Sequence, residues 1–264
     1  MDLGLKDKRA LVLGSTKGIG QGIATLLAQE GAKVAVCGRD ADDARKIAEE
    51  ISANTGASVR SYSVDLTDQA SVGDLIKSCT EDFGGFDIVI NNGGGPPPGG
   101  VADVTMDVWE AQYRPLFLSQ VEITNAFLPG MRERGWGRVL IVASSGTVQP
   151  IPHLGISNTI RVALTNWAKS LASEIAADGV TVNTVLPGRI HTARVDRIDV
   201  NEAKTGNKDV EQARADSRAT IPANRYGSVE EFANVAAFLV SDCAGYVTGT
   251  VTRVDGGYIR GVDG

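Results

Sequence analysis

A glycine-rich segment near the N-terminus has the composition of a phosphate-binding turn. The segment is Gly14-Ser15-Thr16-Lys17-Gly18-Ile19-Gly20, and its glycines let a pyrophosphate approach the main chain. The apolar run Arg9–Leu13 precedes it, and Gln21–Glu30 follows with apolar residues at helical spacing. A helix N-terminus offers free N–H groups and a positive dipole end to phosphates, so a strand, a glycine turn and a helix predict a dinucleotide site. A turn whose glycines serve only tight packing is the alternative.

The residues after the second predicted strand indicate which dinucleotide binds. In folds of this kind an acidic residue about 20 positions after the glycines holds the ribose 2′-hydroxyl of NAD. Gly38 stands at that place, Arg39 follows it, and Lys17 adds a cation from the glycine turn. Two cations without a carboxylate suit a 2′-phosphate, so NADP is favoured over NAD, with Asp40 better placed to cap the next helix. A solvated surface arginine is the alternative role of Arg39.

The composition of the chain argues against several classes of partner. Its 264 residues are 42% hydrophobic and carry a net charge of −6, which argues against nucleic acid as a main partner. No apolar run is long enough to span a bilayer and no signal peptide precedes the first strand, so no membrane association is expected. Cys37, Cys79 and Cys243 lie far apart, which indicates free thiols in a reducing compartment, the cytoplasm. No spacing predicts a metal site.

Strand and helix patterns alternate along the whole chain. Strands are predicted over Arg9–Leu13, Lys33–Cys37, Val59–Val64, Asp87–Ile90, Arg138–Ala143, Val180–Leu186 and Thr250–Val254. Helices are predicted over Gln21–Glu30, Asp40–Asn54, Asp68–Phe83, Met106–Glu133, Leu154–Ala177 and Val229–Ser241. This alternation predicts a single α/β domain over residues 1–264, with a doubly wound, parallel, seven-stranded Rossmann-type sheet and helices on both faces. Ligands of such sheets bind outside the carboxyl ends of the strands.

Two segments interrupt the alternation, and one proline lies inside a predicted helix. Gly93–Gly100 contains three consecutive prolines and predicts a functional loop over a cleft. The polar stretch His191–Arg218 predicts a helical flap at about residues 191–218. Pro115 lacks a backbone N–H, so we expect it to kink the longest predicted helix.

Further motifs follow the glycine turn at the ends of the later predicted strands. They are Asp65-Leu66, Asn91-Asn92-Gly93-Gly94, Pro187-Gly188 with Thr192, and Asp255-Gly256-Gly257. With Gly14-x-x-x-Gly18-x-Gly20 they make the chain resemble the short-chain dehydrogenase/reductase family along essentially its whole length, and most of all its bacterial 3-oxoacyl-[acyl carrier protein] reductase-like branch. The resemblance implies that Asp65 lies at the adenine and Asn91 at its ribose, with Leu66 and Gly93 also binding the cofactor. Pro187, Gly188 and Thr192 would hold the nicotinamide end.

The expected active site departs from the pattern of that family. The family uses an Asn, a Ser and a Tyr-x-x-x-Lys pair. A comparison without gaps places Ser144 on the serine, Ser157 on the tyrosine, Arg161 on the lysine and Leu116 on the asparagine. Ser157 and Arg161 are four residues apart, so they share a helix face and should both reach the cleft. The sequence therefore resembles an atypical subgroup that lacks the usual Tyr-x-x-x-Lys pair.

These replacements change how a proton could be delivered. Hydride delivery to a carbonyl leaves an alkoxide that must gain a proton, and serine is a poorer acid than tyrosine. Arg161 can donate to cofactor ribose hydroxyls, but an arginine pKa above about 12 prevents it from supplying a proton. We expect Ser144 to polarise the carbonyl, and the proton to come from water, His153 or His191, the two histidines of the chain. The alternative is that each histidine is simply a polar residue of a loop and takes no part in catalysis.

Two functions fit this sequence. The first is an NADP-dependent reductase or dehydrogenase with a modified acid, acting on a small carbonyl or an acyl thioester such as a 3-oxoacyl group. The second is a cofactor-binding but catalytically silent regulatory or assembly protein. The enzyme is favoured because loss of a general acid typically lowers a rate by about 10²–10⁴ without abolishing it. Arg194 and Arg197 in the predicted flap favour a polar or anionic substrate, although a solvated helix face explains them equally well.

The family resemblance also implies a homotetramer with two-fold axes. The predicted helices Met106–Glu133 and Leu154–Ala177 would form one interface, and the last strand with its neighbouring helix the other. Trp167, Leu171 and Ile175 follow helical spacing, so they face either a partner or the core.

Overall fold

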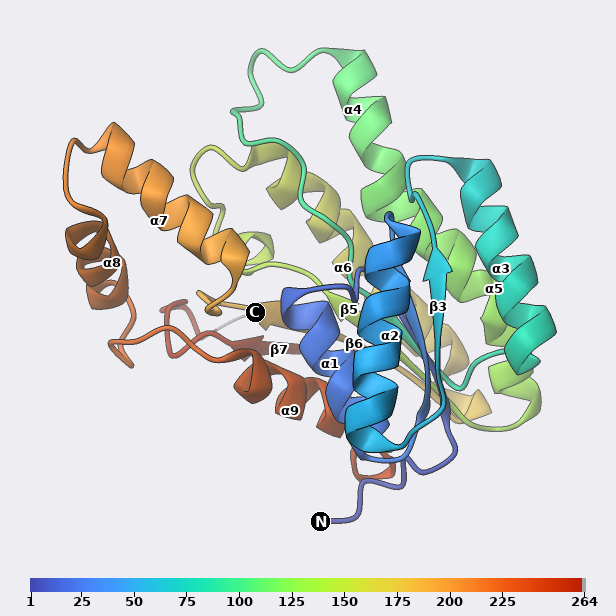
Figure 1. Ribbon diagram of the computed structural model, residues 1–264. Coiled ribbons are helices and arrows are strands. Elements are labelled where there is room, and N and C mark those ends of the chain that lie inside the picture. Colours follow the sequence, from blue (N-terminus) through green and yellow to red (C-terminus); the bar gives the residue numbers. More distant parts are fainter. Residues whose placement is uncertain (263–264) are drawn as a thin grey trace.

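A seven-stranded parallel sheet forms the centre of the computed structural model, which describes residues 1–262 (Figure 1). The strands are β1 Arg9–Val12, β2 Lys33–Gly38, β3 Val59–Ser63, β4 Ile88–Asn91, β5 Gly137–Val142, β6 Val180–Pro187 and β7 Val251–Val254. Their order is β3-β2-β1-β4-β5-β6-β7, and every neighbouring pair is parallel. The chain winds outward from β1 to β3 and then from β4 to β7, so the order reverses between β1 and β4. The predicted doubly wound sheet is confirmed.

Helices cover both faces of this sheet. They are α1 Gly18–Gln29, α2 Ala41–Thr55, α3 Gln69–Phe83, α4 Met106–Tyr113, α5 Ser119–Glu133, α6 Gly155–Ile175, α7 Ala193–Thr205, α8 Val210–Ala219 and α9 Val229–Leu239. Side chains of α1, α2 and α9 share one buried cluster, and those of α3, α5 and α6 share another. Leu11 enters one cluster and Val12 the other, because successive strand residues point to opposite faces. Strands buried on both faces therefore appear as the continuous apolar runs seen in the sequence.

The ends of the helices follow local sequence signals. The Asp40 carboxylate accepts hydrogen bonds from the N–H groups of Asp42 and Asp43, both 2.9 Å long, and caps α2 as predicted. Gly56, with a φ of +72°, ends that helix. Helix α1 begins at Gly18, three residues earlier than predicted and still within the glycine turn.

The segment expected to be one long kinked helix consists of three parts. Helix α4 ends at Tyr113, a π-helical turn (η1) spans Arg114–Leu118, and α5 continues from Ser119. Pro115 lies within the wider π turn, where the Gln120 amide donates to the carbonyl oxygens of Pro115 and Leu116, both at 3.1 Å. At the place of the predicted kink, the structure has a π turn. Pro129, which the sequence analysis did not consider, lies inside α5 without ending it.

Helices α7 and α8 pack on each other beside the β7 edge of the sheet (Figure 1). They occupy most of the stretch expected to be a flap, and their exposed faces are polar. Within residues 1–262 no helix is long and apolar enough to cross a membrane. Leu171 and Ile175 are buried in the core beneath α6, and Trp167 packs against that core. These three side chains therefore belong to the protomer and do not support an interface.

Candidate functional site

The glycine turn joins β1 to α1 at the carboxyl edge of the sheet, beside the point where strand order reverses. Gly14 and Gly18 both have a φ of +57°, a conformation that side chains beyond glycine disfavour. Lys17 precedes α1 without a side-chain cap, and the first turn of α1 contains no acidic residue. The N–H groups and positive dipole end of α1 are therefore open to an anion, as a pyrophosphate site requires.

Two side chains fix the shape of this turn. Ser15 is fully buried; its hydroxyl donates to the Val12 carbonyl at 2.6 Å and accepts from the Cys37 N–H at 2.9 Å. The amide of Asn92, at the end of β4, donates to the carbonyls of Leu13 (3.2 Å) and Gly14 (3.1 Å). Ser15 therefore positions the turn through its buried side chain, and Asn92 performs a similar function that the sequence analysis missed.

Gly20 serves packing, since a β-carbon there would overlap the Gly14 carbonyl and lie 2.6 Å from the Asn92 amide. Ile19, half-buried, packs against the core on the α1 face of the sheet. Tight packing therefore explains the glycine at position 20, whereas the positive φ explains those at positions 14 and 18. Gly14 and Gly18 provide the conformation, and Gly20 provides the close approach of α1 to the turn.

The end of β2 lacks a carboxylate and presents cations instead. A β-carbon on Gly38 would overlap the side chain of Thr16, so Thr16 fills the space next to this residue. Arg39 and Lys17 are exposed, and neither side chain pairs with a carboxylate of residues 1–262. Asp65, after β3, accepts two hydrogen bonds from Thr67, which together with the positive charge of Arg39 lower the pKa of its carboxyl. This end of the site therefore combines two free cations with one ionised acid.

The residues after β3 and β4 lie against α5. Asn91 is fully buried, and its amide donates to the Thr124 hydroxyl of α5 at 2.8 Å. Its side chain is therefore buried inside the protein, with Oδ1 lacking a partner among residues 1–262, and any contact with a ribose would come from its main chain. The carbonyl of Leu66 accepts from the Ser119 hydroxyl at 2.7 Å. Gly93 lies beside Gln120, whose amide nitrogen is 2.8 Å from the place that a β-carbon on residue 93 would occupy.

Ser144 lies just after the end of β5, and Ser157 and Arg161 lie in the first two turns of α6, which contact that strand end. Arg161 donates from Nε to the Ser157 hydroxyl and from one terminal nitrogen to the Val142 carbonyl, both at 3.2 Å. Ser144 is the second residue after β5, and its hydroxyl accepts from the Gly146 N–H at 3.1 Å. The Asn158 side chain packs against Gly146, so the turn after β5 and the first turn of α6 are in contact. Two hydroxyl groups and one guanidinium are thus gathered at the carboxyl edge of the sheet.

The orientation of Arg161 differs from the expectation that it opens toward cofactor hydroxyls. It is only 6% exposed, and its second terminal nitrogen donates to the carbonyls of Gly94 (2.8 Å) and Gly93 (3.4 Å). Burial, aided by the nearby charge of Arg194, lowers the pKa of Arg161 to about 10, below the expected range but high enough to keep it charged at neutral pH. Its bonds bind β5, α6 and the loop after β4 together.

Leu116, which the sequence comparison without gaps placed on the family's asparagine, is 2% exposed. It packs with Ile156 and Ile160 in a small apolar cluster. This position is therefore part of the packing between η1 and α6, and it offers no polar group to the site.

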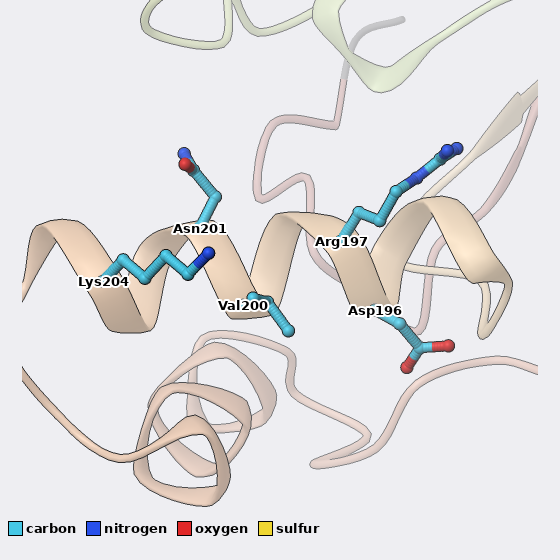
Figure 2. A pocket seen from close by; sticks show the side chains of 5 residues that line it. All are labelled: Asp196, Arg197, Val200, Asn201 and Lys204. Atoms are coloured by element: carbon cyan, nitrogen blue, oxygen red, sulfur yellow. The ribbon is translucent and has the colours of Figure 1, made fainter.

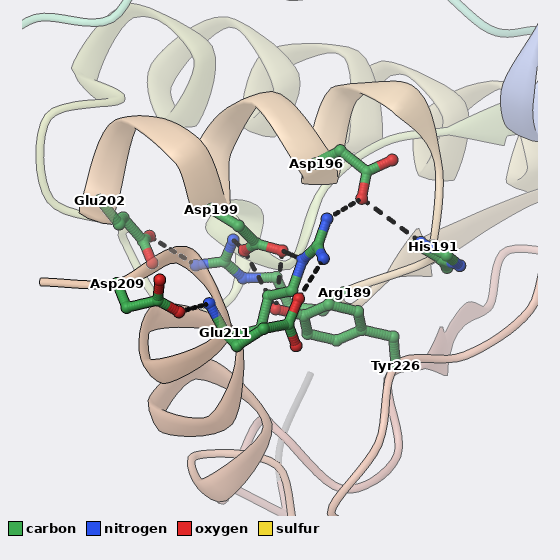
Figure 3. A network of polar contacts seen from close by, with 9 residues as sticks. Arg189, His191, Asp196, Asp199, Glu202, Asp209, Glu211 and Tyr226 are labelled. Carbon is green, nitrogen blue, oxygen red and sulfur yellow. Dashed lines mark hydrogen bonds and ion pairs between the residues drawn. The ribbon is translucent and has the colours of Figure 1, made fainter. Parts of the chain in front are cut away.

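The two histidines lie in different segments, His153 before α6 and His191 before α7. His153 is exposed in a left-handed conformation (φ +60°), and its carbonyl accepts from the Gly99 N–H at 2.7 Å. His191 lies with Nε2 3.4 Å from an Asp196 carboxylate oxygen and its ring 6.3 Å from that of Tyr226 (Figure 3). Neither ring hydrogen-bonds to Ser144 or Ser157 within the part of the chain described here. A proton from either histidine would have to arrive through water.

The turn after β6 approaches both β7 and the glycine turn. Pro187 ends β6, and the Gly188 N–H donates to the Val254 carbonyl at 2.9 Å. Thr192 precedes α7, and its methyl group lies 3.4 Å from where a β-carbon of Gly18 would be. The segments expected to hold the two ends of a dinucleotide therefore meet at one edge of the sheet.

A buried carboxylate holds α7 and α8 in place, and sequence reasoning did not find it. Asp199 is fully buried on α7, and both its oxygens accept from the Tyr226 hydroxyl at 3.0 Å. Arg189 and Arg214 lie 3.9 and 3.8 Å from it (Figure 3). The sequence did contain a signal for it, because Asp196, Asp199 and Glu202 are spaced so that they share one face of a helix.

The two arginines singled out in the predicted flap point to different places. Arg197 lines a hollow of about 340 Å³ along α7, with Asp196, Val200, Asn201 and Lys204 (Figure 2). That hollow includes none of the site residues described above. The guanidinium of Arg194, by contrast, lies against Gly95 in the loop after β4. Of the two arginines, Arg194 is the one near the candidate site.

Comparison with known proteins agrees with this arrangement. The family model described as enoyl-(acyl carrier protein) reductase matches residues 14–259, from the glycine turn to beyond β7. The chain belongs to the short-chain dehydrogenase/reductase family. The family consists of oxidoreductases, and the Rossmann-type sheet found here matches the solved structures of its members.

Three relatives cover nearly the whole chain. An uncharacterized oxidoreductase of Bacillus subtilis, YvrD, is 34% identical over 98% of this chain and 99% of its own length. The 3-oxoacyl-[acyl-carrier-protein] reductase FabG of Haemophilus influenzae is 33% identical over 96% of this chain and 98% of its own. The structure of L-sorbose reductase from Gluconobacter frateurii, complexed with NADPH and L-sorbose, has a TM-score of 0.94 and 31% identity, covering 99% of this chain and 100% of that one.

Proposed function

We propose that this chain is an NADP-dependent oxidoreductase that reduces a carbonyl group, such as that of a 3-oxoacyl thioester, in a modified active site. The observation that carries the proposal is the gathering of Ser144, Ser157 and Arg161 at the sheet edge that holds the glycine turn. The NADPH complex of L-sorbose reductase and the thioester substrate in the name of FabG support the cofactor and substrate class.

The glycine turn fits a dinucleotide, and its surroundings fit NADP. The open N-terminus of α1 would take the pyrophosphate, and the unpaired cations Lys17 and Arg39 would take the 2′-phosphate. Asp65 would lie at the adenine, with the main chain of Asn91 at its ribose. Gly188 and Thr192 would adjoin the nicotinamide, which supplies a hydride when NADPH is bound.

Both serine hydroxyls are prepared to donate to a substrate oxygen. The Ser144 oxygen accepts from the Gly146 N–H and the Ser157 oxygen accepts from Arg161 Nε, so each O–H remains free to donate. The charge of Arg161 strengthens the Ser157 donor and stabilises negative charge that develops on the oxygen. The proton then arrives from water or through water from His153 or His191. Because Ser157 and Arg161 stand in place of the Tyr-x-x-x-Lys pair, we expect slow turnover.

A cofactor-binding but catalytically silent protein is the second candidate. The observation that favours it is the engagement of Arg161 with the carbonyls of Val142, Gly93 and Gly94. A guanidinium held in this way is directed toward the protein, and Leu116 adds no polar group.

The two candidates are separated by NADPH oxidation with a panel of ketones and 3-oxoacyl thioesters. We expect measurable turnover that falls by about 10²-fold in Ser144→Ala, as for loss of one donor to a developing oxyanion. Ser170→Ala, an exposed serine of α6, is the matched control and should retain the rate. Tight NADPH binding without turnover of any carbonyl would contradict the enzyme and support the silent protein.

Cofactor choice is tested separately by fluorescence titration. Arg39→Ala should weaken NADPH binding by about 10-fold or more, the effect of losing a charge-assisted phosphate contact, and leave NADH binding nearly unchanged. Arg45→Ala, which removes the exposed partner of Asp42 on α2, is the control. Equal affinities of the wild-type protein for NADPH and NADH would overturn the NADP assignment.

We further propose that the single domain acts as a cytoplasmic homotetramer, with α7 and α8 forming the flap beside the substrate. Exposed apolar side chains flank both expected interfaces: Tyr113 and Leu118 along α4 and α5, and Phe238 and Tyr246 near α9 and β7. Light scattering that shows a monomer at micromolar concentration would refute the tetramer.

A further inference from the structure

Arg161 and Arg194 place two positive charges at one point of the cleft without a balancing carboxylate. Arg161 donates to the carbonyl of Gly94, and the guanidinium of Arg194 lies against the next residue, Gly95. The charge of Arg194 is near enough to contribute to the lowered pKa of Arg161. Within residues 1–262 no Asp or Glu lies within ion-pair distance of either guanidinium. Two guanidinium groups near one another repel, and an anion bound between them would offset that repulsion.

Arg194 can approach Gly95 closely because glycine has no side chain. A β-carbon on Gly95 would overlap one terminal nitrogen of Arg194 and lie 2.6 Å from the other. Glycine at this position therefore lets a side chain from α7 reach the loop after β4. Because Arg161 bonds both to Ser157 and to the Gly94 carbonyl, it links the loop that Arg194 contacts to one of the two serines.

The acidic residues of α7 cannot neutralise Arg194, because they are engaged elsewhere. Asp196 pairs with Arg214 at 3.1 Å and lies beside His191, and Asp199 accepts from Tyr226 (Figure 3).

We propose that Arg194 binds a carboxylate on the substrate, with Arg161 as a second, buried positive charge, so that the protein prefers oxo acids to neutral ketones and esters. A carboxylate fits because Arg161 commits its donors to carbonyls and serine, which leaves the fork of Arg194 to pair with the two oxygens of one carboxylate. This inference rests on the proposed function for the reaction, but binding alone can test it.

The experiment compares 2-, 3- and 4-oxo carboxylic acids, from pyruvate to levulinate, with their methyl esters. Binding to the NADPH complex is measured by calorimetry, and turnover by NADPH oxidation. At least one acid should bind about 10- to 100-fold more tightly than its ester, the effect of a charge-assisted pair. Arg194→Gln should remove that preference, and Arg194→Lys should restore part of it. Arg197→Gln, at an exposed residue that lines the hollow along the same helix, should keep the preference of the wild type.

The outcomes separate this inference from the proposed function. Binding of an oxo acid that depends on Arg194 supports the inference, even if no carbonyl is turned over. In that case only the reductase proposal is refuted. Equal binding of acids and esters overturns the inference, whether or not the esters are reduced. If Arg194→Gln weakens NADPH itself by 10-fold or more and leaves the acid preference unchanged, the residue binds the cofactor and the inference is wrong.

Discussion

Replacing Arg161 by methionine tests whether this arginine holds the site together. Methionine has similar length without charge or donors, so the change removes four hydrogen bonds and leaves the packing nearly filled. The Val142 carbonyl and the Ser157 hydroxyl are buried and lose their guanidinium partner, at about 1–3 kcal/mol each. Gly94 is exposed, so its carbonyl can bond to water instead. The expected loss in the free energy of unfolding is about 3 kcal/mol.

Urea unfolding followed by circular dichroism at one protein concentration measures this loss. For a chain of this length each kcal/mol corresponds to about 2 °C, so the melting temperature should fall by about 6 °C. Arg197→Met, on the exposed face of α7, should change stability by less than about 0.5 kcal/mol. A loss below about 1 kcal/mol in Arg161→Met would show that the guanidinium does not hold β5, α6 and the loop together, and the reasoning would be refuted.

Three further predictions concern Asn92 at the glycine turn, Asp87 before β4, and the pair Ser157 and Arg161. Asn92→Ala should weaken NADPH and NADH binding by a similar factor of about 10, because the turn loses two hydrogen bonds; a selective effect on one cofactor in titration would contradict this. Burial alone would raise the pKa of Asp87, but hydrogen bonds and charge from Arg9 outweigh it and lower the pKa, so the carboxylate stabilises the fold fully above about pH 4 and less as the pH falls further. Asp87→Asn should therefore flatten the fall in urea midpoint between about pH 5 and pH 2, and an unchanged slope would disprove this role. The double variant Ser157→Tyr with Arg161→Lys should raise the rate on ketones and lower the melting temperature, and no gain in kcat by a folded variant would count against the assignment of the missing acid.

The fold was predictable because its signals are local. A strand buried on both faces must be apolar at nearly every position, and β1, β4 and β5 are. Asp40 and Gly56 mark the ends of α2 through a cap and a left-handed residue, both of which depend only on neighbouring backbone. The right-handed rule for parallel crossovers then leaves few ways to connect the strands.

The site was less predictable because its contacts join distant parts of the chain. Asn91 and Asn92 are adjacent, but one donates inward to α5 and the other to the glycine turn, and nothing in the sequence distinguishes them. Helical spacing places Ser157 and Arg161 on one face without saying which acceptors the guanidinium meets. Those acceptors, the carbonyls of Val142 and Gly94, belong to β5 and the loop after β4.

The bonds of Arg161 form a coherent arrangement, and the sequence comparison implies that Ser157 and Arg161 replace a Tyr-x-x-x-Lys pair; if so, the replacement is not simple decay. Decay would leave a buried charge without partners, and such a charge destabilises a fold by several kcal/mol. Arg161 instead finds a partner for each of its nitrogens, in β5, α6 and the loop after β4. Lysine, with one nitrogen, could not span these acceptors, whereas Arg161 reaches β5, α6 and the loop after β4 together. Arg194 of α7 contacts the next residue of the same loop, so Arg161 and Arg194 both contact this loop.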